Sequence, residues 1–146
     1  QAVFFGYQVE TNGNPYAHLV LRGTMDGPNY GVEYLRKAAA LFAKNKVQNP
    51  AIIVDASHDN CRVDGVKDFA VQGLVIKEVL STMKANPELK KLVRGFMLES
   101  FIKNGNQKLE TATAETIDRG GLSITDQCLG WGETEKLIYD MLELYD

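Results

Sequence analysis

Residues 51–55 read Ala-Ile-Ile-Val-Asp, an apolar run that ends in a carboxylate. A short run of this kind, without alternation of polar and apolar positions, is typical of a strand that is buried on both faces of a parallel sheet. Asn49-Pro50 precedes the run, and a polar loop from Ser57 to Asp64 follows it, so it is bounded at both ends. We therefore expect a buried parallel strand at residues 51–55.

The segments on either side of this strand alternate between strand and helix patterns. Apolar residues recur at steps of three and four over residues 30–46 and again over residues 67–85, which predicts two amphipathic helices. Thr134 is a suitable N-cap for a last helix that ends near Tyr145. Further strand candidates are Leu19-Val-Leu21, residues 92–98 and Leu122-Ser-Ile-Thr125. This alternation predicts a single α/β domain with four parallel strands.

The amino-terminal segment carries a hairpin signal. Residues 3–9 and 17–21 are rich in apolar, aromatic and β-branched side chains, and Asn12-Gly13 lies between them. Asn and Gly both tolerate the positive φ angles of tight turns, so we expect these runs to pair as a β-hairpin within residues 1–22. The polar stretch 103–121 is long for a structureless connection, which indicates a functional loop.

The composition excludes several classes of protein. The 146 residues carry 16 basic and 19 acidic side chains, a formal net charge of -3, so there is no basic excess to favour nucleic acid. No apolar run approaches the roughly 20 residues that cross a bilayer, and no signal-peptide pattern opens the chain, so we expect a cytoplasmic protein without a membrane partner. Two cysteines, Cys61 and Cys128, lack the spacing of a zinc or redox motif and are interpreted as free thiols.

A residue able to do chemistry follows each strand candidate: Arg22, His58, Glu99 and Asp126. Because active sites of parallel α/β sheets are built at the carboxyl ends of the strands, we expect these four side chains to converge. Imidazole and carboxylate ligands suit a divalent first-row metal, and a guanidinium suits a phosphate or carboxylate. Each residue alone also has a structural interpretation: a hydrogen-bonded histidine, a turn aspartate, a solvated glutamate or a surface ion pair.

Four motifs in this order carry a specific resemblance. They are His18-Leu-Val-Leu-Arg-Gly23, Asp55-Ala-Ser-His-Asp-Asn60, Met97-Leu-Glu-Ser100 with Gly105-Asn-Gln107, and Ser123-Ile-Thr-Asp-Gln-Cys-Leu-Gly-Trp131. Together they resemble the carboxy-terminal half of the type I 3-deoxy-D-arabino-heptulosonate 7-phosphate (DAHP) synthases, over nearly the whole chain. The resemblance implies about four βα units of a (β/α)8 TIM barrel, which as a complete domain usually needs about 250 residues. Residues 1–146 would then be one partial barrel domain, with the hairpin in residues 1–22 and the βα units in residues 17–146.

The resemblance also implies a reaction. Enzymes of this family condense phosphoenolpyruvate with erythrose 4-phosphate in the shikimate pathway of aromatic amino-acid biosynthesis. By position, Arg22 would contact phosphoenolpyruvate, while His58, Glu99 and Asp126 would hold a divalent ion such as Mn, Fe, Co or Zn. This ion would polarise the aldehyde carbonyl for attack. The opening hairpin resembles the element that helps to form an aromatic amino-acid feedback site in regulated members.

Several family features are absent from this sequence. Neither cysteine occupies the position of the family's fourth metal ligand, and the Lys-Pro-Arg-Thr-Thr motif for the sugar phosphate is missing. Gly132 separates Trp131 from Glu133, and Cys61, Arg62 and Val63 replace the expected Ser and nearby Lys after Asn60. We expect a homo-oligomer and a fragment that is inactive alone. The alternatives are a non-catalytic half-barrel module for binding or self-association, and a related sugar-acid phosphate synthase.

Overall fold

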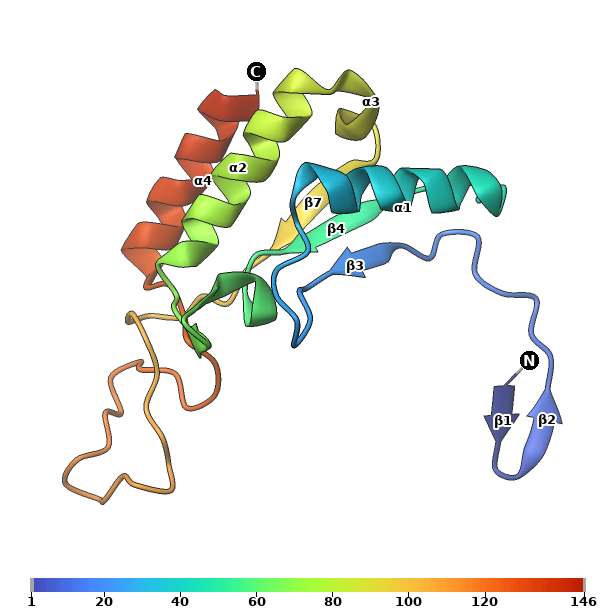
Figure 1. The fold of residues 1–146 in the computed structure, drawn as a ribbon. Helices are drawn as coiled ribbons and strands as arrows, with labels where there is room; N and C mark the ends of the chain where they lie inside the picture. Colours follow the sequence, from blue (N-terminus) through green and yellow to red (C-terminus); the bar gives the residue numbers. More distant parts are fainter. Residues whose placement is uncertain (1, 146) are drawn as a thin grey trace.

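The computed structural model describes residues 2–145 and shows an α/β fold (Figure 1). Its central sheet consists of three parallel strands in the order β3 (Leu19–Leu21), β4 (Ile52–Asp55) and β7 (Val93–Met97). Helix α1 (Val32–Lys44) connects β3 to β4, and α2 (Val71–Ala85) with the short α3 (Pro87–Lys90) leads from β4 to β7. The strand order follows the chain order, which is the arrangement of consecutive βα units.

The helices pack on one face of this sheet, where the main core lies (Figure 1). Ile52 and Val54 of β4 are fully buried, and their core contains apolar side chains from α1, α2, α3 and α4 (Trp131–Tyr145). Leu35 is the buried centre of α1, and α2 contributes the stripe Val75, Ile76, Val79, Leu80 and Met83. Val20 of β3, Ile53 of β4 and Met97 of β7 lie outside this core, and Met97 is 45% exposed.

Five of the predicted elements are confirmed. The parallel strands at residues 19–21, 51–55 and 92–98 are β3, β4 and β7, and the first two predicted helices are α1 and α2. The predicted N-cap of the last helix is wrong, because α4 begins at Trp131. The Thr134 N–H donates to Gly130 O within the first turn, and its side chain bonds to Ser100 Oγ at 2.6 Å.

The predicted fourth strand at residues 122–125 is wrong in this structure, where the parallel sheet has three strands in the described part of the chain. Its backbone bonds instead within a long loop between β7 and α4. Gln107 N–H donates to Ser123 O at 2.8 Å, and Asn106 Nδ2 donates to Thr125 O at 2.7 Å. These partners replace a strand ladder. The Gln107 side chain further bonds to backbone atoms of Asp118 and Leu122, which closes the loop at residues 108–117.

The predicted pairing of the hairpin is also wrong. A hairpin does form, but β1 (Ala2–Phe4) pairs with β2 (Tyr7–Val9) across Phe5-Gly6, whose φ angles are 47° and 79°. Residues 19–21 join the parallel sheet instead, because Leu21 is buried in the core there. In Figure 1 the hairpin lies apart from the sheet. Among residues 2–145, no helix has both the length and the hydropathy to cross a membrane.

Candidate metal centre

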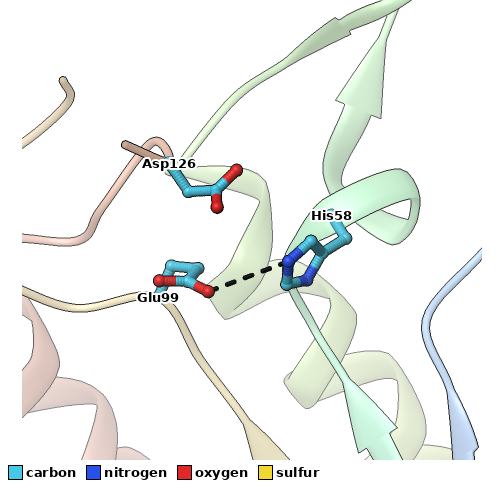
Figure 2. Close-up of side chains that lie close together, drawn as sticks. All are labelled: His58, Glu99 and Asp126. Carbon is cyan, nitrogen blue, oxygen red and sulfur yellow. Dashed lines mark ion pairs between the residues drawn. The ribbon is translucent and has the colours of Figure 1, made fainter. Parts of the chain in front are cut away.

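The structure brings His58, Glu99 and Asp126 together at the carboxyl ends of β4 and β7 (Figure 2). Each offers one ligand atom, and these atoms all lie within 4.8 Å of one another. All three side chains are partly buried, and they point toward a common space from three segments. Among the described residues this is the one group of three or more His, Cys, Asp and Glu side chains that could hold a metal ion.

The carboxylate of Asp55, the last residue of β4, orients the imidazole of His58 through the ring nitrogen that faces away from Glu99. His58 Nδ1 lies 2.9 Å from Asp55 Oδ2, while Asp55 Oδ1 accepts the Ser57 N–H at 2.9 Å. The other ring nitrogen, Nε2, lies 3.8 Å from Glu99 Oε1. His58 also has a φ of 53°, in the left-handed region that is uncommon for residues other than glycine. Local backbone strain of this kind is found preferentially at functional sites.

Glu99 is held by a glutamine that is fully buried inside the fold. Gln72, in the first turn of α2, accepts the Glu99 N–H at 2.9 Å and donates to Glu99 O at 3.2 Å. The same Nε2 group donates to Gln127 O at 3.3 Å, next to Asp126. One side chain therefore ties the backbone at Glu99 to the backbone beside Asp126.

Asp126 is paired with a lysine. Lys67 Nζ lies 2.5 Å from Asp126 Oδ1, and the pair is partly exposed. This hydrogen bond lowers the pKa of Asp126 below its ordinary value, and the positive charges of Lys67 and Arg22 act in the same direction. The carboxylate of Asp126 is therefore stabilised in the ionised form that a metal ion requires.

Arg22 follows β3 and lies at the same end of the sheet, but its contact with the cluster is weaker. Arg22 Nε is 4.0 Å from Asp55 Oδ2, and the Arg22 side chain is 57% exposed. Gly23 has a φ of 78° and packs so tightly that an added Cβ would lie 2.6 Å from Asp59 C and 2.7 Å from Asn60 N. The guanidinium is therefore on a rigid backbone and available to an anion.

Both cysteines are free, as expected. The structure also shows both of them buried, and neither joins the cluster. Cys61 donates to His58 O and Cys128 donates to Asp126 O, each at 3.4 Å. Burial raises the pKa of both thiols.

A cavity of about 340 Å³ lies beside Glu99, and its lining includes Ser100, Ser123 and Thr125.

The sequence pattern did not reveal Asp55, Gln72 and Lys67 as site residues. Two sequence signals point to Gln72 and Lys67. Gln72 is a polar residue within the apolar stripe of α2, and Lys67 follows an Asp64-Gly65 turn. The resemblance implies a lysine soon after Asn60, where the sequence has Cys61, Arg62 and Val63 instead. The structure places Lys67 at the cluster from a position farther along the chain.

The fold and the cluster define a class of protein: consecutive βα units with a His/Glu/Asp group, of the kind that holds a divalent cation, at the carboxyl ends of their strands. The DAHP synthetase I family profile matches residues 1–138, and the chain belongs to this family.

Named relatives agree with this assignment. The chain is 39% identical over 130 residues to the Trp-sensitive phospho-2-dehydro-3-deoxyheptonate aldolase of Enterobacter agglomerans, covering 88% of this chain and 34% of the relative. It is 35% identical over 133 residues to the Tyr-sensitive enzyme of the same organism, covering 91% and 57%. A solved structure of the aldolase from Francisella tularensis SCHU S4 superimposes with a TM-score of 0.76 at 29% identity, covering 92% of this chain and 36% of that one. The chain thus spans roughly a third to a little over half the length of these relatives.

Proposed function

We propose that this chain forms the carboxy-terminal part of a cytoplasmic DAHP synthase, which condenses phosphoenolpyruvate with erythrose 4-phosphate. The observation that carries the proposal is the convergence of His58, Glu99 and Asp126 in a chain of this family. The three parallel strands, in chain order with helices on one face, support their assignment to consecutive βα units of a (β/α)8 barrel. Residues 1–146 would thus be a single partial barrel domain.

The residues present fit a divalent metal ion. One imidazole and two carboxylates are a usual donor set for first-row metals, and the distances between their atoms allow one ion to reach all three. Asp55 completes the arrangement of carboxylate, histidine and metal in which a second carboxylate orients the ligand. A bound ion would act as a Lewis acid toward the aldehyde carbonyl.

The chain's own residues would perform the remaining steps assigned to this half of the site. Asp55 keeps the proton of His58 on Nδ1, so that Nε2 presents a lone pair toward Glu99 and Asp126. Arg22 would bind an anionic group of phosphoenolpyruvate, because its planar guanidinium matches phosphate and carboxylate oxygens. The cavity beside Glu99, with the hydroxyls of Ser100, Ser123 and Thr125, would accommodate part of a polar substrate.

Titration of the chain with Mn²⁺ by isothermal calorimetry tests the metal proposal. We expect binding by the wild-type chain and its loss in His58→Ala and Glu99→Gln. His18→Ala is a matched control, because His18 is exposed and is not part of the cluster. Failure of the wild-type chain to bind any of Mn²⁺, Co²⁺ and Zn²⁺, or equal binding by His58→Ala, would contradict the proposal.

A second measurement addresses the activity. The 146-residue sequence contains no Lys-Pro-Arg-Thr-Thr motif, so we expect no condensation of phosphoenolpyruvate with erythrose 4-phosphate by this chain alone. Turnover would be measured as consumption of phosphoenolpyruvate in the presence of Mn²⁺. Measurable turnover that disappears in His58→Ala would overturn the expected inactivity while supporting the assignment of the site.

Self-association is a second candidate function, and a specific observation favours it. Val20, Ile53 and Met97 lie outside the helix-covered core, and the outer edge of β7 pairs with no other strand of the described chain. Apolar surface and open strand edges favour association. Light scattering at micromolar concentration tests for a homo-oligomer, and a monodisperse monomer would argue against this candidate.

A further inference from the structure

Lys67 occupies a position that neither the metal donor set nor the phosphoenolpyruvate contact explains. Its Nζ atom lies 2.5 Å from Asp126 Oδ1, although the two residues are 59 positions apart. Oδ2 of Asp126 accepts no hydrogen bond from the described residues. The carboxylate of Asp126 thus has one oxygen bound by a cation of the protein itself and one oxygen available.

A small hairpin brings Lys67 to this place. Strands β5 (Arg62–Val63) and β6 (Val66–Lys67) are antiparallel and are joined by Asp64-Gly65, with φ angles of 49° and 80°. Positive φ at both central residues is the mark of a type I′ turn, whose twist matches that of the strands it joins. Arg62, which pairs with Lys67 in this hairpin, bonds to Gly65 O and Asp59 Oδ1, each at 2.5 Å.

Asp126 lies in the long loop between β7 and α4, outside any strand or helix. Hydrogen bonds to Thr125 O and Gln127 O hold the backbone on either side of it, but they do not orient its carboxylate. A free aspartate side chain there can turn either oxygen, or neither, toward His58 and Glu99. A charge-assisted hydrogen bond from an ammonium is strong and short, so it selects one orientation.

We infer that Lys67 is a positioning residue of the metal site: by binding Oδ1 it presents Oδ2 of Asp126 to the ion as a single-oxygen ligand. This inference rests on the proposed function. The hairpin β5–β6 is then part of the structure that supports the site, because it positions the backbone of Lys67 within reach of Asp126. The positive charge of Lys67 also repels a divalent ion, but it bonds to the oxygen that the ion does not use.

Four single variants of the full chain test the inference by Mn²⁺ calorimetry. Lys67→Met removes the ammonium, and we expect the dissociation constant to rise about tenfold or more, as for other residues that orient metal ligands. Lys67→Arg keeps a cationic donor and should retain most of the affinity.

Gly65→Ala strains the hairpin turn without creating a clash, because no atom lies within 4 Å of the added Cβ, and it should weaken binding. Gly6→Ala is the matched control. Gly6 has a nearly identical φ of 79° and equally open surroundings, but it lies in the distant β1–β2 turn.

A spectroscopic readout separates positioning from a merely structural role. In Lys67→Met both oxygens of Asp126 are free to bind, so the visible absorption of bound Co²⁺ should change with the coordination number. The melting temperature of the metal-free protein should stay near that of the wild type, because the Lys67–Asp126 pair is partly exposed.

Wild-type affinity and an unchanged Co²⁺ spectrum in Lys67→Met would overturn the inference while leaving the proposed function intact. Tighter binding by Lys67→Met would overturn it as well, because repulsion would then outweigh positioning. If the wild-type chain binds no metal, the proposed function and the inference fail together.

Discussion

Asp55 Oδ2 and His58 Nδ1 are 2.9 Å apart, three residues from each other at the end of β4. Both oxygens of the Asp55 carboxylate act as acceptors, one for His58 and one for the Ser57 N–H. The proton of the neutral imidazole therefore lies on Nδ1. The sequence Asp-Ala-Ser-His thus carries both the ligand and the group that fixes its tautomer.

Asp55→Asn should reverse this tautomer. If the amide oxygen keeps the Ser57 N–H, the amide NH₂ faces Nδ1 and the imidazole proton moves to Nε2, where it blocks the ligand atom. We expect the affinity for Mn²⁺ to fall by about 10- to 100-fold. Nitrogen chemical shifts of the His58 ring would report the tautomer directly, and Asp26→Asn, at an exposed position, is the control. Unchanged shifts and affinity would contradict the prediction.

Gln72→Leu should destabilise the fold and loosen the site together. The substitution removes three hydrogen bonds and leaves the Glu99 N–H and two backbone carbonyls without this partner. We expect the free energy of unfolding to drop by about 1–3 kcal/mol. Urea denaturation measures the loss, and calorimetry with Mn²⁺ should show weaker binding. Gln8→Leu, on the exposed hairpin, should change neither quantity.

Gly23→Ala should damage the segment that carries Arg22. A methyl group at this position meets backbone atoms of Asp59 and Asn60 at 2.6–2.7 Å, and the φ of 78° disfavours any residue with a Cβ. We expect a stability loss of more than about 1 kcal/mol, with weaker binding of phosphoenolpyruvate in the presence of Mn²⁺. Gly13→Ala, with a φ of 72° and open surroundings, isolates the cost of the backbone conformation from that of the clash.

Both cysteine thiols should react slowly with iodoacetamide in the folded protein. Cys61 is fully buried and Cys128 is 4% exposed, and burial raises the pKa of each thiol, so less thiolate is present at neutral pH. The pH profile of alkylation should be displaced to higher pH relative to a small thiol, and urea should abolish the difference. Rapid labelling of either residue in the native protein at pH 7 would show that the thiol is accessible.

The sequence predicts those residues of the site whose positions follow directly from the strand that precedes them in the chain. Arg22, His58 and Glu99 each follow an apolar run that forms β3, β4 or β7, and parallel strands bring such positions to one end of a sheet. The buried strand at residues 51–55 was predictable for the same reason, because Ile52 and Val54 are apolar without interruption. Asp126 follows a segment that forms no strand, so its place beside them comes from the fold of the loop.

Contacts between distant residues could not be predicted in this way. Gln72 bonds to residues 27 and 55 positions away, and Lys67 reaches Asp126 over 59 positions. The failed hairpin has a similar cause. Asn12-Gly13 is a favourable local turn, but burial of Leu21 in the core outweighs the turn and draws residues 19–21 into the parallel sheet.

Hydrogen bonds at the base of the long loop between β7 and α4 fix the geometry of the site independently of the length of the loop. Gln72 ties Glu99 to Gln127, while Gln107 bonds to Asp118 and Leu122, so residues 108–117 project beyond both connections. The entropy of closing a loop changes slowly with its length. Insertions, deletions or a grafted peptide could therefore be accommodated within residues 108–117 while the two carboxylates stay in place, which makes this segment a natural attachment point for a probe or tag.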